Sequence, residues 1–359
     1  MDKKKIRIRE LSLEQLKESL IKLGEKAFRA NQILEWIWKK NVRSFDEMSN
    51  LSFELRKRLS EKFEIDHIEI SDVQVSLDKT IKYAFELSTN QVIEGVLIPT
   101  KSRMTACISS QVGCSLACKF CATGKLKLLK NLTPGEIVDQ FVYLMNEAET
   151  RYQQKLTNLV YMGMGEPLLN YSNVLKSIEF ITGAHGLGFS AKRITVSTAG
   201  ISKQIKRLAD DNVKFNLALS LHAANDFKRN QIMEINESND LKSLAEALQY
   251  FYSKTNTRVT FEYIIFKDFN DQLSDAIELA DFCKNIPCKI NIIEYNPIEG
   301  GEFTQADYTN VEAFATYLLS KNLIVNIRRS RGKDIDAACG QLANKNESIN
   351  LDSRILKSK

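Results

Sequence analysis

Short β-rich runs alternate with amphipathic helical stretches along most of this sequence, from about residue 100 to about residue 330. The β-rich runs lie at 104–109, 159–162, 193–197, 215–221, 259–266, 289–295 and 323–328. The amphipathic stretches lie at 134–149, 174–181, 202–210, 241–254, 274–284 and 311–320. Strand, helix and strand repeated at this spacing require parallel strands joined by crossover helices. We therefore expect an open or closed α/β barrel whose chemistry lies at the carboxyl ends of its strands.

The amino-terminal region has helical periodicity instead. A capping box that begins at Ser12 precedes leucines spaced by three and four residues, which predicts a helix with one buried stripe. Two further helices are expected at 30–40 and 53–63. Trp36 and Trp38 could stack on nucleic acid bases, although aromatic residues on short helices more often pack in a core.

The periodicity changes from helical to alternating at about residue 70. Runs at 80–87 and 92–98, joined by four polar residues, predict a β-hairpin that leads into the main domain. The predicted parts are a helical accessory domain at 1–68, a hairpin extension at 69–99, a catalytic core at 100–342 and a polar tail at 343–359.

Composition and charge favour a cytoplasmic protein without a membrane segment. No apolar run approaches the roughly 20 residues that span a bilayer, and the first residues lack the apolar core of a secretory signal. The 7 unevenly spaced cysteines do not resemble a secreted disulfide framework, so metal ligation, redox catalysis or burial are expected. The net charge of +5 does not establish a polyanion partner, but basic clusters at 125–130 and 328–333 flank cysteines. We expect a monomer.

Cys114, Cys118 and Cys121 follow the first predicted strand of the barrel. Structural zinc sites and iron–sulfur clusters that only carry electrons take four protein ligands. A loop with three thiolates therefore leaves one coordination position of the metal centre open. A zinc ion completed by a distant histidine is the competing interpretation. The histidines available for such a site are His67, His185 and His222.

This cysteine spacing, with Phe120 before the last cysteine, resembles the signature of the radical S-adenosylmethionine enzymes. A second motif, Gly-Met-Gly-Glu-Pro at 163–167, follows the next strand, where that family has a glycine-rich segment that binds the methionine amino group. The resemblance implies a [4Fe-4S] cluster on the three cysteines and S-adenosylmethionine on the open iron, with Gly165 and Glu166 at its ammonium group. Electron transfer from the cluster then cleaves the sulfonium to a 5′-deoxyadenosyl radical.

Further segments narrow the resemblance. Segments 107–114, 162–168 and 334–342 look like those of the RNA adenine methyltransferases that use a methylated cysteine, and 26–36 reads like their amino-terminal domain. The best match is to dual-specificity members, which methylate carbon 2 of one adenine in 23S rRNA, at the peptidyl transferase centre, and of the adenine 3′ to the anticodon in some tRNAs. The implied fold is a partial (β/α)6 barrel with an RNA-binding helical domain. The implied partners are an electron donor such as flavodoxin and a thiol reductant.

The resemblance assigns roles to two further cysteines and a glutamate. Carbon 2 of adenine carries an unactivated hydrogen, so no general base can make it a nucleophile for ordinary methyl transfer. The resemblance implies that Cys339 takes a methyl group from one molecule of S-adenosylmethionine. A radical made from a second molecule of S-adenosylmethionine then removes hydrogen from that methyl group, and the resulting methylene radical adds to the ring. Cys107 would release the adduct through a transient disulfide with Cys339, and Glu94 would accept the ring proton. Without the resemblance, Glu94 would be interpreted as solvent-facing and both cysteines as buried.

Positions at the strand ends match cofactor contacts of the family. The matched residues, which bond the ribose, adenine or carboxylate of S-adenosylmethionine, are Ser197, Ser220, Leu221, His222 and Asn296. Without the resemblance, His222 would more often be interpreted as a histidine at the edge of a core, with its hydrogen bonds made within the protein, than as a cofactor contact. Cys283 and Cys288 match no motif and are expected to be structural.

Three alternatives stand beside this reading. A related enzyme methylates carbon 8 of the same ribosomal adenine and confers antibiotic resistance, whereas Val112 and Pro167 here follow the carbon-2 pattern. A non-catalytic iron–sulfur or zinc protein that binds RNA would need neither the 163–166 segment nor the paired Cys107 and Cys339. A radical enzyme acting on a small molecule or a protein is disfavoured by the helical domain and the basic clusters.

Overall fold

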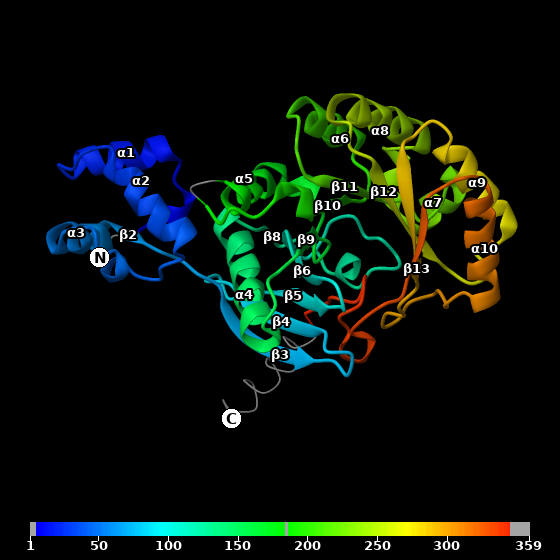
Figure 1. Cartoon of the computed structure of the whole chain (residues 1–359), viewed down its shortest axis with the longest axis horizontal. Coiled ribbons are helices and arrows are strands. Elements are labelled where there is room, and N and C mark those ends of the chain that lie inside the picture. The colour runs from blue at the N-terminus through cyan, green and yellow to red at the C-terminus, as the bar shows by residue number, and fades with distance from the viewer. Residues whose placement is uncertain (1–4, 184–185, 345–359) are drawn as a thin grey trace.

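The amino-terminal region folds into a small helical domain that stands to one side of the molecule (Figure 1). This computed structural model describes residues 5–183 and 186–344, so His185 and most of the predicted polar tail lie outside the described residues. The elements of the domain are α1 (Leu13–Lys22), α2 (Arg29–Leu34), the π-helical η2 (Glu35–Lys39) and α3 (Phe53–Lys62), with the strands β1 (Ile6–Arg7) and β2 (Phe63–Glu64). The predicted capping box is confirmed, since the Ser12 and Gln15 side chains each accept from the other residue's backbone N–H, at 3.2 and 2.8 Å. The parallel pairing of β1 with β2, which the sequence did not predict, joins the two ends of the domain.

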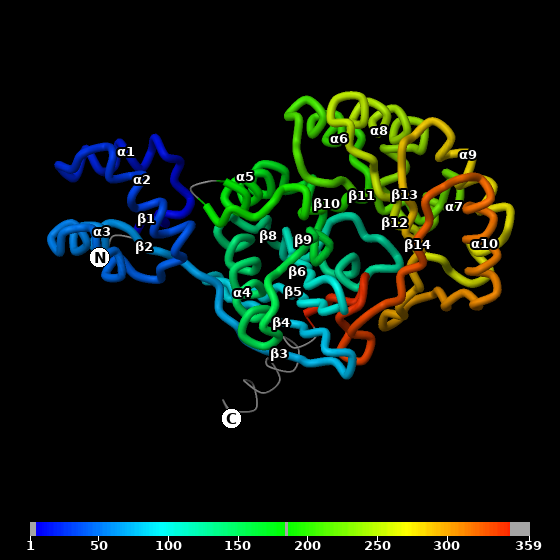
Figure 2. Tube along the Cα trace, in the orientation of Figure 1, coloured from blue at the N-terminus to red at the C-terminus, as the bar shows by residue number. Residues whose placement is uncertain are grey.

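One large sheet organises the rest of the described chain. Its strands are β3 (Glu69–Val75), β4 (Ile81–Glu86), β5 (Val92–Pro99), β6 (Met104–Ile108), β9 (Asn158–Tyr161), β10 (Ile194–Thr198), β11 (Asn216–Ser220), β12 (Val259–Ile265), β13 (Cys288–Glu294) and β14 (Val325–Arg328). The order across the sheet is β14-β13-β12-β11-β10-β9-β6-β5-β4-β3. All neighbours from β6 to β14 are parallel, as the alternating pattern predicts. Figure 2 shows the chain turning steadily from β6 to β14 as an incomplete barrel.

Helices connect the parallel strands and cover the outside of the barrel (Figure 1). They are α4 (Pro134–Tyr152), α5 (Tyr171–Thr182), α6 (Ser202–Asp210), α7 (Asp226–Ile232), α8 (Leu241–Thr255), α9 (Leu273–Cys283) and α10 (Tyr308–Ser320). Six of these agree with the predicted amphipathic stretches, whereas α7 was not predicted. A partial α/β barrel with a helical domain before it is therefore confirmed. No helix in the described ranges is long and apolar enough to cross a membrane.

The predicted hairpin is part of the same sheet. Strands β4 and β5 pair antiparallel, β5 pairs antiparallel with β6, and the unpredicted β3 adds a further antiparallel strand beside β4. The turn between β3 and β4 also reaches the carboxyl-terminal segment, because Ser76 Oγ donates to Asp334 at 2.5 Å and Gly332 N donates to Asp78 at 3.0 Å. The extension thus holds the segment that leads to Cys339.

A buried ion pair joins the helical domain to helix α4. Both Nη atoms of Arg9 donate to the carboxylate of Asp139, at 2.8 and 2.7 Å, and both side chains are about 2% exposed. Beside this pair, Trp38 stacks on Phe180 of α5 with ring centroids 3.8 Å apart. Trp38 is therefore a core residue of the joint. This agrees with the prediction that aromatic residues on short helices more often pack in a core than stack on bases.

Candidate active site at the carboxyl ends of the strands

The three cysteines of the predicted cluster loop lie in the connection from β6 to α4, and they line one cavity of about 230 Å³, the cysteine pocket. Gly113 precedes them with a φ of +73°, and a Cβ there would lie 2.0 Å from the carbonyl oxygen of Lys127, so only glycine fits. Burial raises the pKa of Cys114 to about 11 and that of Cys118 well above the usual thiol value. Thiolates in such a pocket need a nearby positive centre, which a metal centre supplies on binding.

No three His, Cys, Asp or Glu side chains among the described residues converge closely enough to bind a single metal ion, which disfavours a zinc ion on the cysteine loop. A multi-iron cluster differs, because each thiolate binds a different iron. The described histidines have other partners: His67 contacts Asp139 and Val42 in the domain joint, and His222 accepts the N–H of Ile264 at 3.0 Å. His67 cannot be the fourth ligand of a zinc site on the cysteine loop, because His67 lies in the joint between the helical domain and α4.

The segment from Gly163 to Pro167 forms the next wall of the cysteine pocket. Gly165 has a φ of +93°, and a Cβ there would lie 2.4 Å from the Cβ of Gln111. The buried carboxylate of Glu166 accepts the N–H groups of Leu168 at 3.0 Å and Ala199 at 2.7 Å. Burial raises the pKa of Glu166 to about 6, and these N–H groups oppose part of that shift. The Thr198 side chain also bonds this carboxylate, and since a carboxylate has about four acceptor sites, one remains for a cationic ligand.

The predicted contacts at the next two strand ends also reach the cysteine pocket, which Ser197, Ser220 and His222 line. His222 is 3% exposed with a left-handed φ of 58°, and burial followed by the charge of Arg229 lowers its pKa to about 3. The ring is therefore neutral. Because Nδ1 accepts from Ile264, Nε2 carries the proton and is a donor.

Two predicted cofactor contacts lie outside the lining of the cysteine pocket. The Leu221 side chain is fully buried, and its backbone bonds Glu262 and Arg229. Asn296 is 3% exposed and donates to the carbonyl of Cys339 at 3.3 Å, while its Oδ1 has no protein partner. That free acceptor, next to Cys339, is a position where a ligand donor can bind.

Cys107 and Cys339 both line the cysteine pocket, although 232 positions separate them in the sequence. Cys107 lies on β6 opposite Val96, and burial raises the pKa of its thiol to about 12. Cys339 is exposed to the pocket. The residues after it are fixed to the cysteine loop, since Ala122 N donates to the Gly340 carbonyl at 2.7 Å and Thr123 Oγ1 donates to the Leu342 carbonyl at 2.6 Å.

Glu94 is 2% exposed, so the solvent-facing interpretation of this residue is wrong. Its carboxylate accepts the N–H groups of Ala343 at 2.8 Å and Asn344 at 3.2 Å, and Lys82 Nζ lies 3.3 Å from the other oxygen. Glu94 lies on the same face of β5 as Val96, two residues away.

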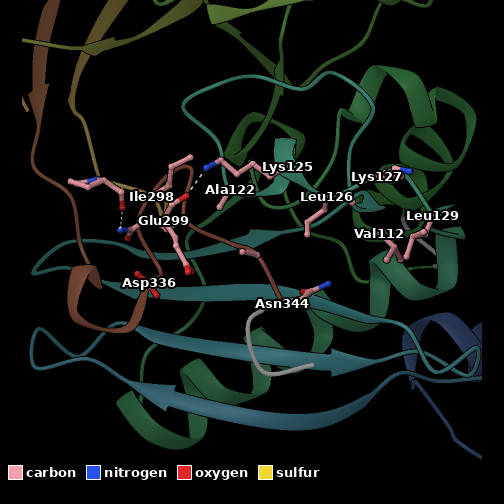
Figure 3. A pocket seen from close by; sticks show the side chains of 14 residues that line it. Val112, Ala122, Lys125, Leu126, Lys127, Leu129, Ile298, Glu299, Asp336 and Asn344 are labelled. Carbon is pink, nitrogen blue, oxygen red and sulfur yellow. Dashed lines mark hydrogen bonds between the residues drawn. The ribbon is translucent and has the colours of Figure 1, made fainter. Parts of the chain in front are cut away.

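A second cavity, the outer pocket of about 550 Å³, is lined by Ala122 and Leu126 of the cysteine loop and by Asp336 and Asn344 of the carboxyl-terminal segment (Figure 3). The predicted basic cluster after the cysteine loop contributes Lys125 and Lys127 to it. Lys125 Nζ is already bound by the carbonyl oxygens of Glu299 at 2.5 Å and Gly300 at 2.9 Å. Gln341 and Ala343 line this cavity too, so the segment that carries Cys339 separates the two pockets.

Known proteins match both parts of the chain. Residues 6–65 match the family described as the ribosomal RNA large subunit methyltransferase N-terminal domain, and residues 108–282 match the radical SAM superfamily. The probable dual-specificity RNA methyltransferase RlmN of Cytophaga hutchinsonii is 58% identical over 340 residues, which cover 95% of this chain and 93% of that protein. The chain belongs to the RlmN family.

Other relatives agree over a similar length. The dual-specificity RNA methyltransferase RlmN of Campylobacter concisus is 42% identical, over 94% of this chain and 91% of that protein. A radical SAM methyltransferase from Sphaerobacter thermophilus, solved by crystallography, is 36% identical with a TM-score of 0.87, over 94% of this chain and 99% of that one. The radical SAM fold predicted from the cysteine loop is thus confirmed.

As a radical SAM protein, this RlmN-family member uses a [4Fe-4S] cluster and S-adenosylmethionine. The cysteine pocket fits both groups. Three thiols offer cluster ligands, Glu166 offers an acceptor for an ammonium group, and neutral His222 offers a donor.

The sequence did not reveal Arg229, which holds this part of the RlmN-family site together. It is fully buried on the unpredicted helix α7 and donates to the carbonyl oxygens of Ala199 at 2.6 Å, Ser220 at 3.2 Å and Leu221 at 3.1 Å. Burial lowers its pKa to about 10. These bonds fix the loops after β10 and β11. One signal in the sequence was Asn225, a helix N-cap residue four positions after the end of the predicted strand 215–221.

Proposed function

We propose that this protein is a dual-specificity RNA methyltransferase that acts on carbon 2 of an adenine in 23S rRNA, at the peptidyl transferase centre, and of the adenine 3′ to the anticodon in some tRNAs. The names of its relatives support RNA as the substrate. The observation that carries the proposal is that Cys107 and Cys339 line the same cavity as the three cluster-loop cysteines. Direct methyl transfer from a sulfonium needs neither thiol, whereas a methyl group carried by the protein needs a carrier sulfur and a second sulfur for release.

In this mechanism Cys114, Cys118 and Cys121 hold the cluster, and Gly165, Glu166, Ser197, Ser220, Leu221, His222 and Asn296 bind S-adenosylmethionine. When bound, these groups supply a carbon radical that removes hydrogen from a methyl group. Glu166 has a free lone pair for the ammonium group, and His222 Nε2 donates to a ligand acceptor. Leu221 would contribute through its backbone, since its side chain is buried.

Cys339 is the proposed methyl carrier. Its sulfur would attack the methyl carbon of one S-adenosylmethionine, S-adenosylhomocysteine would leave, and the resulting S-methylcysteine would supply the carbon that later bonds carbon 2 of the adenine. Glu94, whose carboxylate is held by its donors, would accept the proton from carbon 2 of the covalent adduct, and the unpaired electron that radical addition leaves on the ring would return to the oxidised cluster. The sulfur of Cys107 then attacks the sulfur of Cys339, which forms a disulfide and breaks the carbon–sulfur bond, and the released carbon takes up a proton. A thiol reductant reopens the disulfide, and an electron donor such as flavodoxin reduces the cluster.

Mass spectrometry of RNA nucleosides tests this proposal. Anaerobically reconstituted protein is incubated with unmodified 23S rRNA and with tRNA, and 2-methyladenosine is separated from 8-methyladenosine. We expect 2-methyladenosine from both RNAs. The product 8-methyladenosine would contradict the proposed position, and methylation of only one RNA would contradict dual specificity.

Two cysteine variants test the chemistry. Cys339→Ala is expected to cleave S-adenosylmethionine while it methylates no RNA, because the carrier is lost. Cys107→Ala is expected to accumulate a covalent protein–RNA adduct, visible as a shifted band in a denaturing gel. Normal turnover by Cys107→Ala would refute the disulfide step.

A further inference from the structure

An ion pair inside the cysteine pocket has no role in the mechanism above. Arg328, the last residue of β14, donates from Nη1 to Glu262 Oε2 of β12 at 3.1 Å. Asn291 of β13 donates to the other oxygen of Glu262 at 2.8 Å. The Glu262 side chain is 6% exposed, whereas that of Arg328 is 41% exposed. Glu262 is therefore fixed from two sides, and the guanidinium it orients is open to the pocket.

The guanidinium of Arg328 shares the cysteine pocket with both Cys107 and Cys339. Burial lowers the pKa of Arg328, but the charges of Cys339, Glu262 and Cys107 outweigh burial and raise it overall. Arg329 and Arg331 also line the pocket, but Arg329 is 71% exposed and lies 4.0 Å from Glu294, and Arg331 lies 3.7 Å from the carboxylate of Asp78. Arg328 is thus a permanent cation near the two sulfurs between which the adenine reacts.

The chemistry of the ring indicates what such a cation would contact. Carbon 2 of adenine is bonded to N1 and N3, and both nitrogens are hydrogen-bond acceptors without a hydrogen of their own. When carbon 2 is joined to the carbon on Cys339, these two nitrogens lie one bond from the reacting atom. A guanidinium has five N–H donors, of which the bond to Glu262 uses one.

We propose that Arg328 donates a hydrogen bond to the ring nitrogen next to the reacting carbon, N1 or N3, and that Glu262 positions the guanidinium for this contact. The proposal rests on the proposed function. Addition of a carbon radical to carbon 2 places extra electron density on the neighbouring nitrogens, and a fixed cationic donor stabilises that density. Arg328 is then a catalytic residue, and Glu262 is a positioning residue.

The contact also favours carbon 2 over carbon 8. Carbon 8 is bonded to N7, which accepts a hydrogen bond, and to N9, which carries the ribose and has no lone pair free to accept. When the base presents carbon 8 to Cys339, only one neighbouring nitrogen, N7, can accept a hydrogen bond. When it presents carbon 2, both N1 and N3 can accept one. Arg328 would add to the selectivity for carbon 2 through this difference.

The test combines Arg328→Gln with substrate RNAs that carry adenosine, 1-deazaadenosine or 3-deazaadenosine at the target position. Single-turnover formation of methylated base is measured by mass spectrometry. We expect Arg328→Gln to lower the rate on adenosine roughly 100-fold or more. Loss of the bonded nitrogen is expected to slow the wild type strongly but to slow Arg328→Gln far less, because the variant no longer makes that bond. Deaza effects of equal size in both proteins overturn the proposal.

Further measurements separate this contact from a structural role. Arg328→Gln is expected to keep the thermal melting temperature, the visible absorbance of the cluster and the cleavage of S-adenosylmethionine without RNA. Arg328→Lys is expected to recover part of the rate, and Glu262→Gln to lose rate with the same pattern across the deaza RNAs. The matched control is Arg193→Gln, an exposed arginine before the start of β10 that should behave like the wild type.

Each outcome distinguishes the inference from the proposed function. A wild type that forms no 2-methyladenosine refutes the proposed function itself. A wild type that methylates the adenosine RNA and both deaza RNAs at similar rates overturns the role of Arg328, even if the Arg328 variants fail to fold.

Discussion

Asp139→Asn tests the joint between the helical domain and the barrel. Burial by itself would raise the pKa of Asp139, but Arg9 and His67 outweigh burial and lower it from 3.8 to about 2. A shift of this size corresponds to about 2.5 kcal/mol at 1.36 kcal/mol per pKa unit. Removal of one charge also leaves buried Arg9 without its partner, a change that typically costs about 3–5 kcal/mol. We expect a loss of about 3 kcal/mol in the free energy of unfolding.

Tryptophan fluorescence can follow this joint directly. The chain has 2 tryptophans, and Trp38 lies between Arg9, at 4.9 Å, and Phe180, at 3.8 Å. With a urea dependence of about 1–3 kcal/mol per molar, the midpoint for Asp139→Asn should fall by about 1 M or more. The control is Asp281→Asn, which breaks an exposed pair with Lys284 and should leave the midpoint unchanged.

The pH dependence gives an independent check. The pKa of Asp139 is lower in the folded than in the unfolded protein, so its stabilisation is complete above about pH 5 and is lost as the pH falls toward 2. The wild type should therefore lose more stability than Asp139→Asn between pH 5 and pH 3. The reasoning is refuted if the variant unfolds at the wild-type urea concentration, or if both proteins lose stability equally over this range.

Three further variants test the site. Gly165→Ala should lower the affinity for S-adenosylmethionine at least 10-fold by calorimetry, because its Cβ would lie 2.4 Å from Gln111, whereas Gly188→Ala has open space and should bind normally. Arg229→Met should destabilise the protein by about 3 kcal/mol or more and weaken S-adenosylmethionine binding, and an unchanged melting temperature would contradict its role in fixing the strand-end loops. Cys283→Ala should leave the iron content and RNA methylation unchanged; loss of iron would show that this cysteine is not merely structural.

The parallel strands could be predicted because their two buried faces leave continuous apolar runs of recognisable length. Strand β3 was missed because it is an edge strand with mostly exposed or half-buried side chains, so its sequence resembles a loop. Helix α7 was missed because its 7 residues are too few to establish a helical period. Sequence patterns therefore did not predict β3 and α7, because both elements are stabilised by contacts with the rest of the fold.

The cluster loop and the glycine segment could be located from sequence because each is a contiguous motif. Glu94 could not be read correctly, since the atoms that bury it belong to Lys82 on the next strand and to Ala343 and Asn344, about 250 positions later. The same limit applies to the pair of Glu262 and Arg328, whose strands meet only through β13. Contacts between residues so far apart in the sequence depend on the order of the strands in the sheet, which a local sequence pattern does not reveal.

The pairing of β5 with β6 has a consequence for substrate size. In a closed barrel the first and last parallel strands bond each other, and ligands enter only through the mouth. Here β6 has β9 on one side and β5 on the other, so neither of its edges is left for β14. The gap between β6 and β14 is held instead by the β3–β4 turn, through the bonds of Ser76 with Asp334 and of Asp78 with Gly332, so room for a larger substrate there would cost these two bonds and no strand pairing.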